Sequence, residues 1–289
     1  MSTAQDLLAP ETAMGAVVLK VADLDAMIRF YRDGVLLTLL AQEGSRAVLG
    51  RGAVPVLVLE HEPALRHAAP GSAGLFHTAV LFDTEADLAA ALWSTATRYP
   101  GSFTGSADHL VSRAFYFDDP EGNGVELYWD RARSDWQWVD GRVRMDSLRL
   151  DPNAFVQQHL DEVRLQGAPD SRAVVGHVHL SVGDTATARD FYVDALGFAV
   201  TADLGSALFV SAGGYHHHMA MNVWRSRGAG LRAPALGLGQ VHIEVPSEDD
   251  LGAVVDRMRH RGVGVEHDGR AARFDDPWGN RIELDVRGR

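Results

Sequence analysis

Two closely similar stretches decide the fold of this chain: FDDPEGNGVEL at Phe117–Leu127 and FDDPWGNRIEL at Phe274–Leu284. In each stretch the proline fixes φ and the following glycine and asparagine accept positive φ, which predicts a tight turn that leads into a strand. The two stretches lie in the same place in the two halves of the chain. The chain is therefore expected to be an internal duplication.

A second pair of similar stretches supports the duplication. GAVVLKVADLDAMIRFYRDGV begins at Gly15, and GHVHLSVGDTATARDFYVDALGF begins at Gly176. Each starts with alternating apolar residues, typical of a strand, and continues with the apolar spacing of an amphipathic helix. The halves are thus expected to share one order of elements, with small insertions.

Each half is itself doubled. A strand opens each quarter of the chain, an amphipathic helix with a polar start follows, and short strands with turn residues close the quarter. The four opening strands read VVLKV, HTAVLF, HVHLSV and QVHIEV. We predict an α+β protein of two tandem domains, each built of paired βαβββ modules that form a curled, partly open barrel-like sheet.

The domain limits follow from where the repeats stop. Residues 1–130 would form the first domain and residues 173–289 the second. Residues 131–172 break the strand pattern with glycine, proline and charged residues, so we expect a connector with one short helix near Asn153–Arg164.

The composition limits the function. The chain has no cysteine, which excludes disulfides and thiolate metal sites and leaves its 13 histidines, with Asp, Glu and Gln, for metal or acid–base chemistry. A net charge of −12 argues against a nucleic-acid-binding surface. No stretch approaches the roughly 18 apolar residues of a membrane span. We expect a cytoplasmic protein with small-molecule partners.

The chain resembles the vicinal oxygen chelate superfamily of glyoxalases, bleomycin-resistance proteins and extradiol dioxygenases. The resemblance rests on the paired modules, the histidine-bearing first strand and the DPxGNxxEL ending, and covers nearly the whole chain. The stretches GHVHLSV, FYVDALGF, SAGGYHHHM and DHLVSRAFYFDDPEGNGVELYWD are similar to the two-domain catechol 2,3-dioxygenase branch. Enzymes of that kind hold Fe(II) with two histidines and one carboxylate, which leaves positions for a catecholate and O₂.

The resemblance implies a metal site in the C-terminal half. It places ligands at His177 in GHVHLSV and at Glu283 in RIELDV. The third aligned position is Gln240, and His242 lies two residues further on the same strand face. Both are kept as candidates, and we favour His242 because imidazole binds Fe(II) better than an amide oxygen does. His179 shares the face of His177 and is expected to bind substrate.

Three consecutive histidines, His216–His218, follow Gly-Gly-Tyr in a run that reads as a strand. By its spacing, His218 matches the acid–base position of the resembled family, and His216 should share its strand face and assist, while His217 points away. The alternative is a hydrogen-bonded polar cluster without a role in proton transfer.

Two positions depart from the family pattern. Ala16 stands where the alignment with His177 predicts a ligand in the first half. Arg273 replaces the active-site tyrosine of the second half and is expected to attract an anionic substrate. The first half nevertheless keeps a candidate second site, made of His77, His109, Tyr116 and Glu126.

The sequence thus predicts an extradiol ring-cleaving dioxygenase that uses Fe(II) and O₂ on a catechol-like aromatic. The alternatives are a non-catalytic protein that binds or sequesters an aromatic compound, and another enzyme of the superfamily that uses Mn, Ni or Zn. Ala16 and Arg273 favour the first alternative, and Gln240 favours the second. Pairing of edge strands between subunits would give a homodimer.

Overall fold

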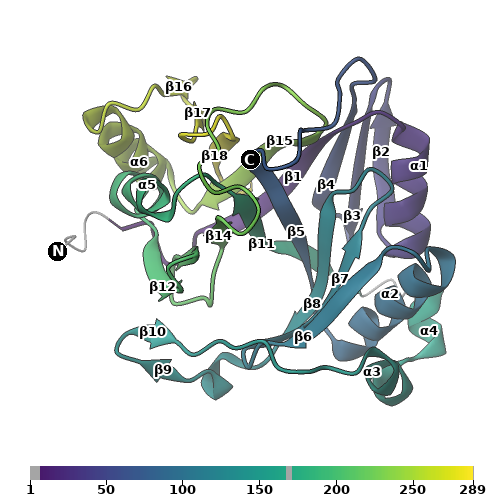
Figure 1. Cartoon of the computed structure of the whole chain (residues 1–289). Coiled ribbons are helices and arrows are strands. Elements are labelled where there is room, and N and C mark those ends of the chain that lie inside the picture. The colour runs from purple at the N-terminus through teal and green to yellow at the C-terminus, as the bar shows by residue number, and fades with distance from the viewer. Residues whose placement is uncertain (1–6, 167–170, 289) are drawn as a thin grey trace. The chain divides into compact units, whose positions relative to one another are not determined.

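The structure, a computed structural model, describes residues 7–166 and 171–288 (Figure 1). Residues 167–170 of the predicted connector lie outside this part. The chain divides into two compact units, here called the N-terminal and C-terminal units. The N-terminal unit comprises Ala16–Arg66 and His77–Gly176, and the C-terminal unit comprises Met1–Gly15, His67–Phe76 and His177–Arg289.

The N-terminal unit contains two strand–helix–three-strand modules. In the first, the strands pair in the order β2–β3–β4–β1, and in the second they pair in the order β5–β8–β7–β6. In both modules the opening strand runs parallel to its partner and the other pairs are antiparallel. The elements are β1 (Ala13–Val21), α1 (Leu24–Arg29), the helical turn η2 (Phe30–Gly34), β2 (Thr38–Glu43), β3 (Arg46–Arg51), β4 (Val54–His61), β5 (Gly74–Phe82), α2 (Glu85–Arg98), β6 (Phe103–Asp108), β7 (Ser112–Asp118) and β8 (Gly124–Asp130).

The C-terminal unit repeats this arrangement. Its strands pair in the orders β12–β13–β14–β11 and β16–β17–β18–β15. The elements are β11 (Ala173–Ser181), α5 (Thr185–Arg189), the helical turn η4 (Asp190–Ala195), β12 (Ala199–Asp203), β13 (Ala207–Ser211), β14 (Met219–Asn222), β15 (Gly237–Val245), α6 (Glu248–His260), β16 (Glu266–His267), β17 (Ala271–Asp275) and β18 (Arg281–Val286). The predicted α+β fold class with paired βαβββ modules is confirmed.

The connector has more structure than the sequence predicts. After the short η3 (Arg133–Asp135), β9 (Trp138–Val139) and β10 (Arg142–Val143) form a small antiparallel pair. The predicted single helix is divided into α3 (Pro152–His159) and α4 (Glu162–Leu165). The division occurs because Leu160 is extended and the side chain of Asp161 accepts a hydrogen bond from the Val163 amide, which starts a new helix.

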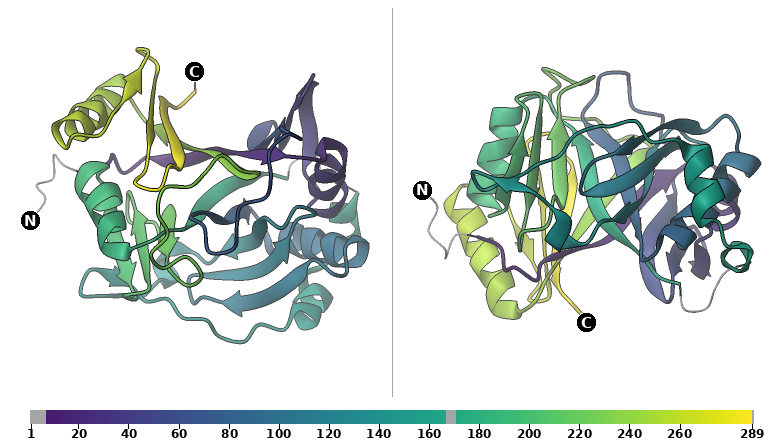
Figure 2. Two further views of the ribbon diagram at one scale, coloured as in Figure 1. Left: turned by 45° about the horizontal axis from the view of Figure 1, so that its top comes forward. Right: turned by 90° about the horizontal axis from the view of Figure 1, so that it is seen from below.

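Side-chain caps start the long helices where the sequence predicts polar starts. Thr84 caps α2 by accepting a hydrogen bond from the Asp87 amide, and Ser247 caps α6 in the same way from Asp250. Figures 1 and 2 show α1 and α2 on one side of the strands of their unit, and α5 and α6 on one side of theirs. In each unit the helices therefore cover one face of the strands and leave the opposite face without helices.

The DDPxGN turns do more than reverse the chain. In the N-terminal unit the Tyr31 hydroxyl donates to the Asp119 carboxylate at 2.9 Å, and in the C-terminal unit Tyr192 donates to Asp276 at the same distance. Both aspartates also accept hydrogen bonds from backbone amides of their own turns. This tyrosine–aspartate clasp joins the helical segment of one module to the closing turn of the other in both units.

The clasp makes stability depend on pH. Burial raises the pKa of Asp119 from 3.8 to about 6. The folded state thus favours the protonated acid, so this contribution is fully present below pH 3.8 and is lost as pH rises through about 6. A shift of about 2 pKa units corresponds to about 3 kcal/mol. We expect Asp119→Asn to remove this part of the pH dependence of unfolding, measured by urea denaturation between about pH 4 and pH 7.

The exposed neighbour Asp118 supplies the control, because Asp118→Asn should leave the pH dependence of the unfolding free energy as it is in the unmodified protein. Burial also raises the pKa of Asp276, so a similar dependence persists in both variants from the second clasp. An Asp119→Asn protein with an unchanged pH dependence would contradict the assignment.

A buried ion pair joins β3 to α2 in the N-terminal unit. The Arg51 Nη2 atom contacts the Asp87 Oδ1 atom at 3.0 Å, and the two side chains are 5% and 1% exposed. Asp87 also accepts hydrogen bonds from the hydroxyls of Thr84 and Ser171. Because the partners come from β3, α2 and the end of the connector, this network fixes these elements to one another.

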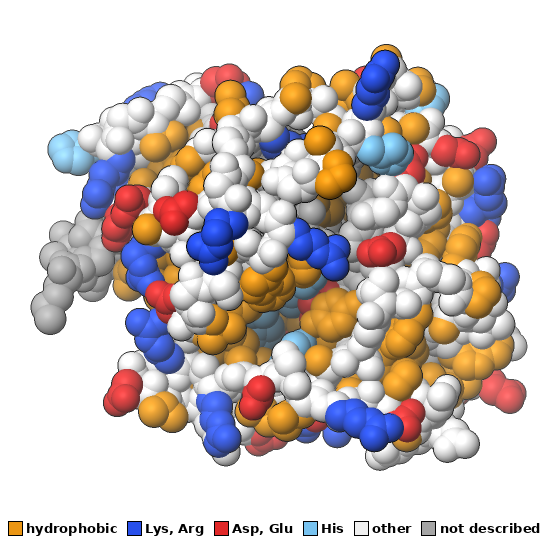
Figure 3. All heavy atoms as spheres, in the orientation of Figure 1, with side chains coloured by type: hydrophobic (Ala, Val, Ile, Leu, Met, Phe, Trp, Pro, Cys, Tyr) orange, Lys and Arg blue, Asp and Glu red, His pale blue; other side chains and the backbone are white. Residues whose placement is uncertain are grey.

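The surface is mixed in charge. Figure 3 shows acidic and basic side chains interspersed over the face that is viewed. Among the helices of residues 7–166 and 171–288, none is both long and apolar enough to span a lipid bilayer.

Candidate functional site

The N-terminal unit holds a buried histidine–carboxylate pair. The His77 Nε2 atom lies 3.0 Å from the Glu126 Oε2 atom, and the side chains are 8% and 3% exposed. The pair forms because β5 and β8 are parallel neighbours, with Ala79 opposite Glu126 and His77 two residues earlier. Both residues belong to a group of side chains that could hold a metal ion.

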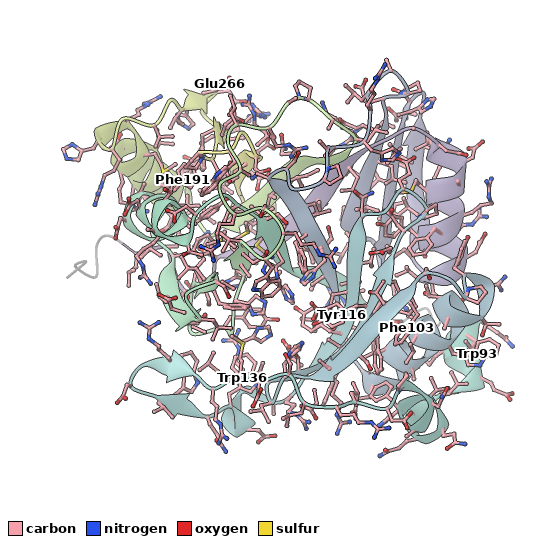
Figure 4. The ribbon with its side chains drawn as sticks, viewed as in Figure 1. Trp93, Phe103, Tyr116, Trp136, Phe191 and Glu266 are labelled. Atoms are coloured by element: carbon pink, nitrogen blue, oxygen red, sulfur yellow. The ribbon has the colours of Figure 1, made fainter. Side chains whose placement is uncertain are left out.

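Tyr116 extends this pair. It lies directly opposite Glu126 across the β7–β8 ladder. Burial, followed by the charge of Glu126 and a hydrogen bond to it, raises the pKa of Tyr116 well above 10. Figure 4 shows Tyr116 on the side of the sheet away from α2, the helix that carries Trp93. The hydroxyl therefore stays protonated next to the carboxylate.

His109 completes the network. Its Nε2 atom is 2.7 Å from the Tyr116 hydroxyl, and its Nδ1 atom is 2.8 Å from the carbonyl oxygen of Asp146 in the connector. A carbonyl only accepts, so Nδ1 carries the proton of a neutral ring, and its Nε2 shares with Glu126 the single hydroxyl proton of Tyr116. The imidazole of a neutral His109 thus has a defined tautomer, with Nε2 as its acceptor atom.

The candidate second site of the first half is therefore assembled inside one unit. His77, Glu126, Tyr116 and His109 form a continuous series of contacts over β5, β6–β7 and β8. Neutral imidazole and carboxylate are donors that Fe(II) and other first-row divalent metals accept, so His77 and Glu126 fit such an ion. Asp146 was not predicted from the sequence, because it contacts His109 through its backbone carbonyl and not through its side chain.

The predicted ligands of the second half are only partly brought together. His242 lies opposite Glu283 on neighbouring strands, and their Nε2 and Oε1 atoms are 3.6 Å apart. The Gln240 amide nitrogen contacts His242 Nε2. Among the described residues, the group of potential metal donors there consists of His242, Glu283 and Asp285 and does not include His177.

Arg273 occupies this region. Its Nε atom contacts the Glu283 Oε2 atom, and its Nη1 atom lies 3.1 Å from Asp268 Oδ2. Hydrogen bonds to Asp268 and then to Glu283 raise the pKa of Arg273. The sequence leads us to expect an arginine that attracts an anionic substrate, whereas the structure pairs its guanidinium with two carboxylates of the protein.

The histidine triplet lies in the turn between β13 and β14 rather than on a strand. Gly213 and Gly214 adopt positive φ just before it, so the alternation of strand faces does not apply. The His216 and His217 Nδ1 atoms are 2.7 Å apart, which requires one to donate and the other to accept. His217, expected to point away, packs its ring 4.0 Å from that of His177.

His218 and His179 have separate surroundings. The Nδ1 atom of His218 accepts a hydrogen bond from the Ala212 amide at 3.2 Å, which leaves Nε2 as the protonated atom of a neutral ring. The His179 Nε2 atom is 3.0 Å from the Asn222 amide nitrogen, and its ring packs against Trp224. Asn222 and Trp224 were not singled out in the sequence.

Comparison with known proteins gives consistent results. A family model described as Glyoxalase/Bleomycin resistance protein/Dioxygenase superfamily matches residues 13–127 and 174–284. Over 273 residues, 92% of this chain and 94% of the relative, the chain is 34% identical to a catechol-2,3-dioxygenase of Bacillus subtilis strain 168.

Solved structures show the same fold. A candidate dioxygenase of Bacillus subtilis matches with a TM-score of 0.67 at 14% identity, covering 96% of this chain and 86% of the other. Glyoxalase I of Zea mays matches with a TM-score of 0.58 at 17% identity, covering 96% and 92%. At these identities the matches establish the architecture and not the reaction.

Proposed function

The chain belongs to the glyoxalase/bleomycin resistance protein/dioxygenase superfamily, and from this premise we propose that it is an extradiol-type dioxygenase that cleaves a catechol-like aromatic with Fe(II) and O₂. The observation that carries the proposal is the continuous series His77, Glu126, Tyr116 and His109 inside one unit, in which His77 and Glu126 are buried. Similarity to a catechol-2,3-dioxygenase over most of both chains supports the same reaction class.

We propose that the ion is held in the N-terminal half by His77 and Glu126. A set of two histidines and one carboxylate needs one further imidazole. When bound, Fe(II) would supply open positions at which a catecholate and O₂ meet.

The surrounding residues would handle protons. A catechol loses protons when it binds as a chelating anion, so an acceptor is needed close to the ligands. Because the carbonyl of Asp146 fixes a proton on Nδ1 of His109, its Nε2 is the atom that would accept the proton lost by the catechol. The high pKa of Tyr116 keeps this hydroxyl a hydrogen-bond donor between turnovers.

The C-terminal alternative stays a competing proposal. It uses His177, His242 or Gln240, and Glu283 as ligands, with His218 and His216 as proton carriers. The contacts of Arg273 with Glu283 disfavour it, because the guanidinium already neutralises the carboxylate that would bind the ion.

Matched variants of the two halves test the proposal. Protein purified without oxygen and loaded with Fe(II) should consume O₂ on addition of catechol and form a coloured ring-cleavage product. His77→Ala should remove both bound iron and O₂ uptake, whereas His242→Ala should retain them.

Three results would contradict the proposal. Loss of iron in His242→Ala but not in His77→Ala would move the centre to the second half. Protein that binds catechol without holding any metal would support a binding protein instead. A stable non-iron metal without O₂ uptake would support another reaction of the superfamily.

A further inference from the structure

One equivalent position holds different residues in the two halves, Tyr116 in the first and Arg273 in the second. On the β7–β8 ladder Tyr116 lies opposite Glu126, and on the β17–β18 ladder Arg273 lies opposite Glu283. Both pairs flank a DDPxGN turn at the same spacing. A neutral hydrogen-bond donor in one half is thus replaced by a permanent cation in the other.

The guanidinium of Arg273 contacts the carboxylate of Glu283, an oxygen ligand that a metal ion at this site would need. Arg273 Nε contacts Glu283 Oε2. The amide nitrogen of Gln240 contacts His242 Nε2, which accepts a hydrogen bond from it. Glu283 Oε1 lies 3.6 Å from that same His242 atom. The donor atoms of His242 and Glu283 are therefore engaged by groups of the protein itself.

We propose that Arg273 is the internal cation of the C-terminal half and closes the group His242, Glu283 and Asp285 to divalent metal ions. The guanidinium stays charged at all accessible pH values and sits against the carboxylate that would be the principal ligand. A divalent ion at Glu283 would be repelled by this charge and would have to displace the ion pair. Among the described residues, the proposed N-terminal site would then remain the one open to a metal ion.

The same contacts weigh against the predicted role of Arg273 in attracting an anionic substrate. Its Nε and Nη1 atoms already bind Glu283 and Asp268. Two backbone amides also donate to Asp268, which lowers the pKa of that carboxyl and keeps it ionised beside the guanidinium. Arg273 is thus held between two fixed negative charges.

The test is made in the full chain with His77→Ala and Glu126→Gln, which remove the N-terminal ligands. Co(II) is titrated anaerobically, and bound metal is measured by equilibrium dialysis, elemental analysis and the visible absorption of Co(II). This background should bind Co(II) weakly. Addition of Arg273→Gln should strengthen binding by about 100-fold, because a unit charge in contact with the ligand carboxylate is removed. Glu283→Gln should reverse the gain.

Two matched controls separate charge from structure. Arg273→Lys keeps the charge and should give no gain. Arg281→Gln removes an arginine of β18 that pairs with Asp275 and Glu266, and should also give none. If Arg273→Gln does not fold, Arg273→Tyr, which copies the residue of the first half, takes its place.

Two outcomes overturn the inference. One is a background protein that already holds a full equivalent of Co(II) and loses it with Glu283→Gln. The other is a folded Arg273→Gln or Arg273→Tyr protein that binds Co(II) no better than the background. Neither outcome bears on catalysis in the first half, so failure here is distinguishable from failure of the proposed function.

Discussion

Replacing Glu126 by glutamine is expected to abolish catalysis. Glutamine keeps the shape of the side chain but removes its charge, and a neutral amide is a poor ligand for a divalent ion. Glu126 is buried against His77 and Tyr116, so the glutamine side chain cannot turn out into solvent. Bound iron should fall to background, and O₂ uptake with catechol should fall on the order of 10³-fold.

The matched control is Glu283→Gln, which makes the same change at the equivalent position of the second half. It should leave iron content and O₂ uptake near those of the unmodified protein. The proposal would be refuted if Glu126→Gln kept its iron and activity while Glu283→Gln lost both.

The second large effect is on stability. Asp87→Ala should lower the free energy of unfolding by about 3–5 kcal/mol, because it leaves the buried guanidinium of Arg51 without its main counter-charge. Burial already lowers the pKa of Arg51, and Asp87 is the charge that opposes this shift. Urea denaturation followed by circular dichroism measures the change.

An exposed pair gives the comparison. Asp203 contacts Arg189 at 2.6 Å, but both side chains are about a third exposed, so Asp203→Ala should cost less than about 1 kcal/mol. Adding Arg51→Met to Asp87→Ala should recover part of the loss, since the stranded charge is then gone. A loss of less than about 1 kcal/mol in Asp87→Ala alone would rule out the proposed importance of the pair.

Local sequence patterns predicted the modules well. Alternation of apolar residues marked the opening strands, and proline with glycine and asparagine marked the DDPxGN turns. The clasp between Tyr31 and Asp119 was not predicted, because it joins residues far apart in the chain. The same holds for the contact of His109 with a backbone carbonyl of the connector.

Two differences between the sequence interpretation and the structure have physical causes. The triplet His216–His218 was assigned to a strand, although the two preceding glycines favour a turn. The contact of Arg273 with Glu283 follows from local spacing, because residues equally spaced about a hairpin turn face each other. The hairpin pattern by itself therefore indicates a cation beside the interior carboxylate.

The limits of the compact units fall inside three strands, β1, β5 and β11. Expression of residues 1–130 alone would produce a fragment that carries Gly74–Phe76 and the start of β1 without most of the unit to which they belong. A fragment of residues 173–289 would lack the same pieces. Truncated versions should therefore expose unpaired strand edges and aggregate, so domain-by-domain dissection is a poor route to studying this protein.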